Sequence, residues 1–194
     1  DVVVAGGMEN MTLAPYALPK ARNGYRMGKG EIIDLMVNDG LWDVYNDYHM
    51  GIAAELCASE MNLTREAQDE FAIASYKKAV AASQAGEFKR EIVPVEVPGR
   101  RGAVTIVDSD EEPFKSKIEK IPGLRPAFKK DGTVTAANAS SINDGAAAVV
   151  LASGEKCKEL GVTPKFRVVG YAGYAHEPEW FTTAPAYAIK KVFE

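Results

Sequence analysis

The sequence predicts an α/β fold in which a long insertion interrupts the sheet. Short apolar runs at residues 2–4 and 146–152 are typical of strands that are covered on both faces. After residue 145 the patterns alternate between strand and helix, as they do in α/β proteins. More than a hundred residues separate the two apolar runs, so the intervening segment must fold as a layer of its own.

The first strand is expected to end at Gly6-Gly7. A stretch rich in proline, glycine and cations over residues 14–31 then predicts an excursion from the sheet. A short helix is expected over residues 32–37. A longer helix is expected over residues 49–61, where apolar residues recur at helical spacing.

The next helix is predicted to begin after Thr64, which is a favourable N-cap, with Glu66 in the first turn. Gly86 is a typical C-terminal stop for it. Within this helix Tyr76 lies among small side chains one turn away on either side.

Residues 92–97 and 103–107 read as two strands joined by the turn sequence PGRRG, which predicts a hairpin. Pro94 would place the first strand at an edge. Residues 108–131 are charged and are expected to be irregular. The rest of the chain is predicted to contain a helix, a third strand and a final helix, at residues 155–161, 166–174 and 184–194.

Composition excludes several classes of protein. The 194 residues are 46% hydrophobic and carry a net charge of −4, which is typical of a globular protein without a basic nucleic-acid footprint. No apolar run approaches the roughly 20 residues of a membrane span. The chain opens on the strand pattern DVVVAGG and stops inside a helical pattern, so we expect a piece of a longer protein, and its compartment cannot be read from this N-terminus.

Candidate catalytic side chains are sparse. Cys57 lies on the apolar stripe of a helix and is expected to be a buried small hydrophobe, whereas Cys157, between lysines, is expected to be exposed. The two cysteines lack metal-ligand spacing and favour a reducing compartment. His49 and His176 are too few to define a triad or a metal site. The acidic residues 110–112 are interpreted as a solvated loop.

Two segments leave alternatives open. In FKSKIEKIPGLRPAFKK, residues 114–130, cations interleave with apolar side chains. Such a surface suits a ligand with phosphates and an apolar body, or is an ordinary charged cover. The small residues Ala136, Ala137 and Ala139 permit either close packing, which spacing alone favours, or carbonyl oxygens that face a cation.

Longer motifs are more specific. VVVAGGMENM, YHMGIAAE, LTREAQDEFAIASY, EFKREIVPVEV, LRPAFKKDGTVTAANASSINDGAAAVVLAS and FTTAPAYAI occur in this order. Together they resemble the thiolase family, most closely its short-chain, potassium-activated acetyl-CoA acetyltransferases, over essentially the whole chain. GTVTAANASSINDGAAA is the most specific signature, and AGGMENM carries Asn10 where the family usually has serine.

The resemblance implies a thiolase-like α/β fold of αβαβα layers in the full protein, with an inserted α+β loop domain that binds coenzyme A. Residues 1–12 would end the first part of the N-terminal half and residues 13–131 would form the loop domain. Residues 132–161 would return to the N-terminal half, and residues 162–194 would open the C-terminal half.

The resemblance also implies roles for individual residues. A potassium ion would be held by Tyr76 and by the carbonyl groups of Ala136, Ala137 and Ala139. The segment at residues 14–31 resembles the arm that joins two dimers into a homotetramer. Its basic residues include Lys20, Arg22 and Arg26. The implied contacts to coenzyme A or its acyl group are His49, Met50, Tyr76, Lys115, Ser116, Lys117, Lys120, Ala127, Phe128 and Ser140.

The implied reaction joins two acetyl-CoA molecules into acetoacetyl-CoA, or reverses that step. The family's nucleophilic cysteine, Asn-Glu-Ala-Phe stretch, Gly-His-Pro histidine and second cysteine have no counterpart in these residues, so this chain is expected to be an inactive fragment without catalytic groups. A catalytically silent coenzyme A-binding or scaffolding protein and a long-chain thiolase are the alternatives. No nucleic acid or membrane partner is expected, and the compartment would be the cytoplasm or the mitochondrion.

Overall fold

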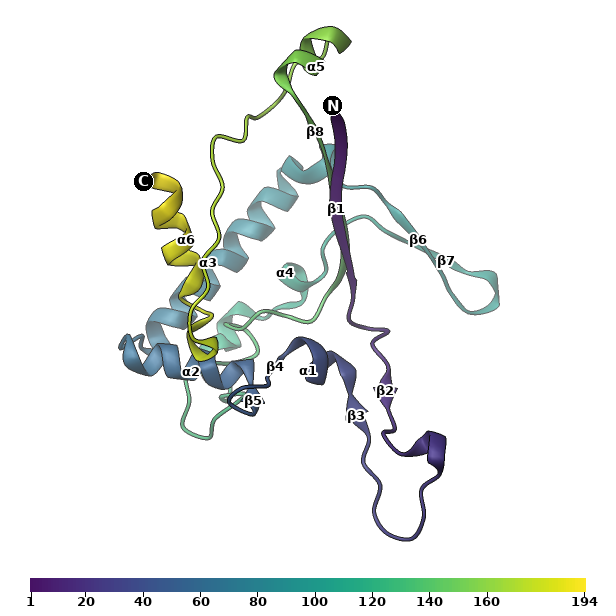
Figure 1. The fold of residues 1–194 in the computed structure, drawn as a ribbon, viewed down its shortest axis with the longest axis vertical. Coiled ribbons are helices and arrows are strands. Elements are labelled where there is room, and N and C mark those ends of the chain that lie inside the picture. Colours follow the sequence, from purple (N-terminus) through teal and green to yellow (C-terminus); the bar gives the residue numbers. More distant parts are fainter. The chain divides into compact units, whose positions relative to one another are not determined.

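The computed structural model describes residues 1–194 and divides into two units. The first unit comprises residues 1–57 and 142–194, and the second comprises residues 58–141. Both mix helices with two-stranded antiparallel sheets (Figure 1). No helix is both long and apolar enough to cross a bilayer.

The sheet of the first unit joins the two ends of the interrupted pattern. β1 (Val2–Asn10) pairs antiparallel with β8 (Asp144–Ala152), with Val2 opposite Ala152 and Asn10 opposite Asp144 (Figure 1). The Thr12 side chain and its backbone N–H hydrogen-bond the Asp144 carboxylate and lower its pKa. The two apolar runs are therefore neighbouring strands of one sheet, although 132 positions separate Thr12 from Asp144.

Two expectations for this sheet are wrong. β1 does not end at Gly6-Gly7, because the missing side chain of Gly6 lets the β8 backbone come close and the ladder continues to Asn10. The strands were also expected to be covered on both faces. Instead the sheet has only two strands, and Val4 is 70% exposed.

The segment after β1 forms short elements. The predicted short helix over residues 32–37 begins later, at Leu35, because the Asp34 carboxylate accepts a hydrogen bond from the Met36 N–H at 3.0 Å and caps the helix there. The elements are β2 (Tyr16–Ala17), η1 (Ala21–Asn23), β3 (Ile33–Asp34), α1 (Leu35–Gly40), β4 (Trp42–Asp43) and β5 (Tyr48–His49).

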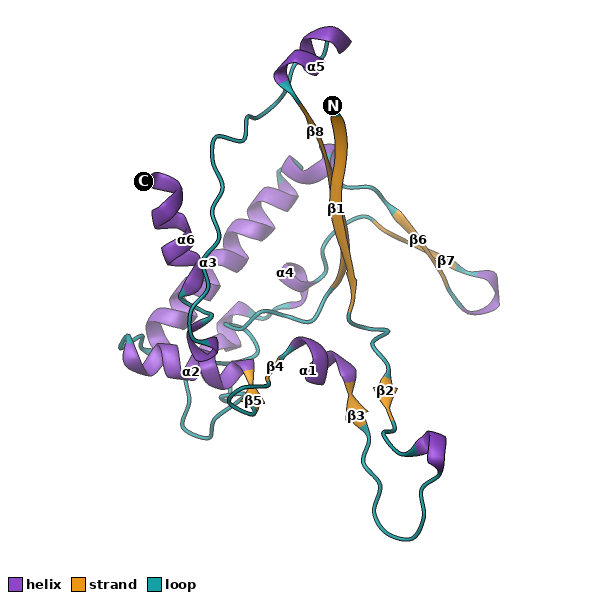
Figure 2. Cartoon of the chain, viewed as in Figure 1, coloured by secondary structure: helices purple, strands orange, loops and turns teal.

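The last part of the first unit contains α5 (Gly154–Leu160), η5 (Pro178–Trp180) and α6 (Ala184–Phe193), so both predicted helices are confirmed. The predicted third strand over residues 166–174 is wrong. These residues have no strand partner and form a loop, as Figure 2 shows. A segment of apolar residues with high strand propensity forms a strand only where a neighbouring strand pairs with its backbone.

The next two helices match their predictions closely. α2 (Met50–Glu60) lies within one residue of its predicted bounds. α3 (Arg65–Gln84) begins after Thr64, whose Oγ1 accepts a hydrogen bond from the Ala67 N–H at 3.2 Å. Gly86 follows the helix in the left-handed region at φ 74°.

The second unit also contains a hairpin and several short helical segments that contact α3. The predicted hairpin is confirmed: β6 (Val95–Pro98) pairs with β7 (Val104–Val107) around η3 (Arg100–Gly102). The segment 108–131, expected to be irregular, contains α4 (Glu112–Lys115) and η4 (Ile118–Gly123). Both contact α3, as does η2 (Glu87–Arg90). The small core of this unit includes Ile121 and Val134.

Candidate functional site

A pocket of about 410 Å³ lies within the second unit. A water molecule occupies about 30 Å³ in the liquid, so the pocket has room for an ion together with part of a larger ligand. Three segments line it: α3, the start of α4 and the turn after Val134. The lining residues are Gln68, Phe71, Ala72, Ser75, Tyr76, Ala79, Glu112, Pro113, Ala137, Asn138, Ala139, Ser140 and Ser141.

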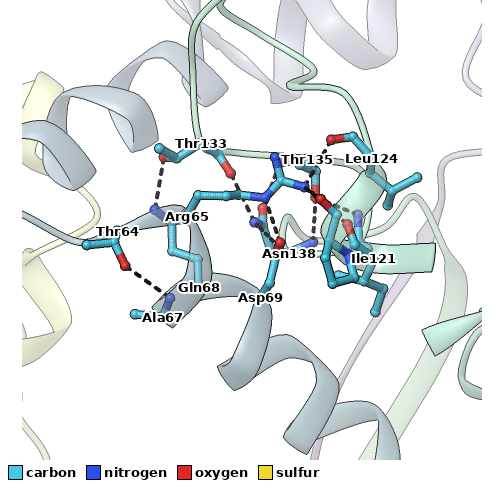
Figure 3. A network of polar contacts seen from close by, with 12 residues as sticks. Thr64, Arg65, Ala67, Gln68, Asp69, Ile121, Leu124, Thr133, Thr135 and Asn138 are labelled. Carbon is cyan, nitrogen blue, oxygen red and sulfur yellow. Dashed lines mark hydrogen bonds and ion pairs between the residues drawn. The ribbon is translucent and has the colours of Figure 1, made fainter. Parts of the chain in front are cut away.

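A buried carboxylate fixes the turn to α3. Asp69 is 4% exposed. One of its oxygens accepts a hydrogen bond from the Asn138 side-chain amide at 3.1 Å, and the other forms an ion pair with Arg65 Nε at 2.7 Å (Figure 3). Because both oxygens are used by donors, the buried charge of Asp69 is compensated.

Arg65 extends this network to the segment after α4. Its Nη2 donates to the backbone oxygens of Ile121 at 3.1 Å and Leu124 at 2.9 Å (Figure 3). The planar guanidinium group offers several donors in a fixed fork, so one side chain binds a carboxylate and a loop at the same time. The first turn of α3 thus holds both η4 and the turn at residues 133–138.

The conformation of the turn itself depends on Asn138 and Thr135. The Thr135 N–H donates to Asn138 Oδ1 at 2.7 Å, and the Asn138 amide donates to the Thr133 carbonyl at 3.1 Å. Thr135 Oγ1 accepts from the Ala137 N–H at 3.3 Å. Side-chain bonds to local backbone groups replace helix or sheet bonds here. The carbonyl groups of residues 136–139 are therefore not committed to a helix or a strand.

Another part of the pocket lining pairs a phenol with a carboxylate. The Tyr76 hydroxyl donates to Glu112 Oε1 at 3.2 Å. The Ser116 hydroxyl lies 3.1 Å from the Glu112 carbonyl oxygen and 3.4 Å from its Oε1. Glu112 is half-buried. The expectation that residues 110–112 form only a solvated loop is therefore wrong for Glu112, because α4 turns its side chain toward α3.

The structure brings four of the predicted site residues to this pocket. Tyr76 comes from α3, and Ala137, Ala139 and Ser140 come from the turn. Ala136 lies in the same turn but is not among the lining residues. Ser116 reaches the pocket wall through Glu112.

The other predicted contacts in this unit lie on its surface. Lys115 is exposed and forms an ion pair with Glu111. Lys117, Lys120 and Ala127 are exposed and Phe128 is half-buried. The Ala127 N–H donates to the Val134 carbonyl at 2.9 Å, which connects residues 127–128 to the segment that leads into the turn.

The remaining candidates belong to the first unit or its boundary. His49 and Met50 stand where β5 passes into α2, and His49 Nδ1 accepts a hydrogen bond from the Gly51 N–H at 2.9 Å. Cys57, expected to be buried, is half-buried. Cys157, expected to be exposed, is buried, because the chain folds back after Gly161 and the Val162 N–H donates to the Cys157 carbonyl.

Sequence reasoning missed three residues of the site: Asp69, Glu112 and Asn138. A signal existed for Glu112, since acidic residues followed by proline are typical of a first helical turn. Asp69 and Asn138 carry no local signal, because their partners are far away along the chain.

The N-terminal domain model of the thiolase family matches residues 1–155 of the chain. Acetyl-CoA acetyltransferase 2 of Arabidopsis thaliana is 56% identical over 193 residues, which cover 98% of this chain and 48% of that protein. The acetyl-CoA acetyltransferase of Cupriavidus necator is 52% identical over 98% of this chain and 49% of its own length. The chain thus spans about half the length of the curated relatives it matches.

A solved thiolase has the same fold. The Acat5 thiolase from Ascaris suum, in complex with coenzyme A, superposes with a TM-score of 0.88 at 44% identity. The match covers 98% of this chain and 48% of the Ascaris chain. This likeness confirms the predicted α/β fold.

Proposed function

Because this chain belongs to the thiolase family, we propose that the complete polypeptide which carries it is an acetyl-CoA acetyltransferase. It condenses two acetyl-CoA molecules to acetoacetyl-CoA and releases coenzyme A, or cleaves acetoacetyl-CoA in the reverse direction. The residues described here bind and position the thioester, while the groups that make and break bonds lie in other parts of the polypeptide.

The observation that carries the proposal is the pocket of the second unit. Tyr76, Ala137, Ala139 and Ser140 were expected to act together from the resemblance alone, and they line one cavity. Small side chains on the turn allow a narrow ligand to approach the backbone, which suits a pantetheine arm. Ser140 is exposed at the pocket and can hydrogen-bond an amide of that arm.

Exposed lysines of the second unit suit the other end of coenzyme A. Lys117 and Lys120 are exposed and have no carboxylate bound to them, so they can face phosphates. Phe128 and Ala127 would form the wall beside the pantetheine arm, with Lys115 and Ser116 near the nucleotide. Residues 13–131 would then act as the coenzyme A-binding loop domain, between residues 1–12 and 132–161 of the N-terminal half. Residues 162–194 would begin the C-terminal half.

The donor set of the pocket also fits a potassium ion. Tyr76, Glu112, Ala137 and Ala139 line the pocket, and they bring a phenol oxygen, a carboxylate and two backbone carbonyl groups to the pocket residues, while hard cations prefer oxygen ligands. Tyr76 and the carbonyl groups of Ala136, Ala137 and Ala139 would hold the ion. When bound, it would supply a positive charge that links α3 to the turn after Val134. It would so order the turn that binds the thioester.

The proposed chemistry proceeds in two transfers. A cysteine thiolate attacks the thioester carbonyl of one acetyl-CoA, forms an acetyl-enzyme and expels coenzyme A. A second acetyl-CoA then loses an α-proton to a base, and its carbanion attacks the acetyl-enzyme carbonyl, which breaks the enzyme thioester, releases the cysteine thiolate and gives acetoacetyl-CoA. Binding of the distant nucleotide positions the carbonyl for both steps. His49 and Met50 would border the acyl end.

We also propose that the complete protein is a homotetramer. The exposed segment with Lys20, Arg22 and Arg26 would supply the arm between two dimers. The unpaired edges of β1 and β8 would pair with further strands of the complete sheet.

The Ser140→Ala variant tests the proposed binding role. In the complete protein we expect the KM for coenzyme A in acetoacetyl-CoA thiolysis to rise about 3- to 10-fold, because one hydrogen bond to the ligand is lost. Thiolysis rates over a range of coenzyme A concentrations give this value.

The matched control is Ser109→Ala, since Ser109 is exposed and lies outside the pocket. An unchanged KM in Ser140→Ala would remove Ser140 from the binding site. Coenzyme A binding without any thiolysis or condensation by the complete protein would instead favour the silent scaffold. Faster turnover of long 3-oxoacyl-CoA substrates would favour the long-chain branch.

A further inference from the structure

We propose that Glu112 provides the negative charge of the cation site and orients the Tyr76 hydroxyl so that its lone pairs face the ion. This inference rests on the proposed potassium site and assigns a positioning role to a residue outside the expected ligand set. Glu112 acts through Tyr76, while Tyr76 and the turn carbonyl groups make the direct contacts.

The charge of the pocket supports this role. Lysine, arginine and histidine are absent from the lining residues, and Glu112 is the only lining carboxylate. The lysine on α4, Lys115, is bound to Glu111, and the other ion pairs of the chain do not involve Glu112. A half-buried carboxylate without a cationic partner attracts a cation.

The hydrogen-bond geometry supports the orientation of Tyr76. A phenol has one proton to donate, and Tyr76 donates it to Glu112 Oε1 at 3.2 Å. The lone pairs of the phenol oxygen are then free to face a cation. A hydrogen bond to a charged acceptor also polarises the O–H bond and makes the oxygen a better ligand.

Ser116 lies beside the carboxylate. Its hydroxyl is close to both the backbone oxygen and Oε1 of Glu112, at 3.1 Å and 3.4 Å. The Glu112 side chain therefore contacts the residue that follows its helix on one side and α3 on the other. This arrangement distinguishes it from Glu111, whose side chain is 68% exposed.

The charge count predicts which ions bind. Protein sites for Ca²⁺ combine several carboxylates, whereas this pocket offers one carboxylate and neutral oxygens. One negative charge balances one monovalent ion. The site should therefore prefer potassium over divalent cations.

The test measures ion binding directly in the complete protein. Its thermal midpoint is recorded as KCl replaces N-methyl-D-glucamine chloride at constant ionic strength, and a bound ion raises that midpoint. We expect Glu112→Gln to require about 10- to 100-fold more KCl than the wild type for the same rise, as is usual when a group behind a ligand is lost. Glu112→Asp, which keeps the charge, should recover part of the response.

Glu111→Gln is the matched control, because it removes the same charge from the neighbouring residue outside the pocket. It should respond to KCl like the wild type. If Glu112→Gln and Glu112→Asp both respond to KCl like the wild type, the proposed role of Glu112 is wrong. The potassium site itself would still stand. A wild type that does not respond to KCl would overturn the potassium site and this inference with it, while the Ser140→Ala result would still decide coenzyme A binding.

Discussion

Asp69→Ala is expected to lower the free energy of unfolding of the complete protein by about 3–5 kcal/mol, because it leaves a partly buried cation without its partner. Asp69 is the buried centre to which both Arg65 and Asn138 bind. Its loss also removes one of the hydrogen bonds that hold the turn to α3, while the bond from Gln68 to Thr133 remains. Urea denaturation followed by circular dichroism measures the change.

Asp69→Asn separates charge from shape. Asp69 accepts a hydrogen bond at each oxygen, whereas asparagine must turn its NH₂ group toward one of the two donors. We therefore expect a loss of about 1–3 kcal/mol, the cost of an unsatisfied buried donor.

The control for both changes is Glu70→Ala, an exposed position on the same helix, where about 0.5 kcal/mol or less is expected. Equal effects at residues 69 and 70 would show that the network does not stabilise the fold. The turn residues Ala137, Ala139 and Ser140 follow the network directly, so coenzyme A affinity should fall with stability in Asp69→Asn but not in Glu70→Ala.

Gly6→Ala is expected to destabilise the complete protein by about 1–3 kcal/mol, the usual cost of overpacking. A Cβ at Gly6 would lie 2.6 Å from the Ala147 carbonyl oxygen and 3.1 Å from Ala148 Cα. Both atoms belong to the backbone of β8, so the strands must separate to admit the methyl group. The thermal midpoint and the urea midpoint both report the change.

Gly7→Ala is the matched control in the next position of the same strand. A Cβ there meets no atom of the chain within 4 Å, and its backbone is not in the left-handed region. Stability should stay the same or rise by about 0.4–1 kcal/mol, because alanine restricts the unfolded chain. A Gly6→Ala variant as stable as Gly7→Ala would show that the close β1–β8 approach does not limit this position.

Elements with strong local signals were predictable from the sequence. The Thr64 N-cap and the helical spacing of α2 and α3 determine structure within a few residues, so their bounds came out within one or two positions. The PGRRG hairpin is local in the same sense. The strand character of residues 2–4 and 146–152 followed from their apolar side chains, whereas their antiparallel pairing did not.

Features that depend on distant partners were not predictable in the same way. Residues 166–174 have a strand pattern but no partner strand, and Cys157 is buried by a reversal of the chain after its helix. Glu112 and Tyr76 are 36 positions apart, and Asp69 and Asn138 are 69 apart. Only the resemblance grouped Tyr76 with the alanine turn, and it did not include the two carboxylates.

We propose above all that the pocket lined by α3 and by the turn at residues 135–141 binds coenzyme A, which carries the thioester. A crystal structure of the complete polypeptide with coenzyme A bound tests it most directly. We predict that the pantetheine arm passes Ser140 and Phe128, with the nucleotide toward Lys117 and Lys120. Coenzyme A bound elsewhere, with no contact to Tyr76, Ser140 or the turn, would contradict the claim.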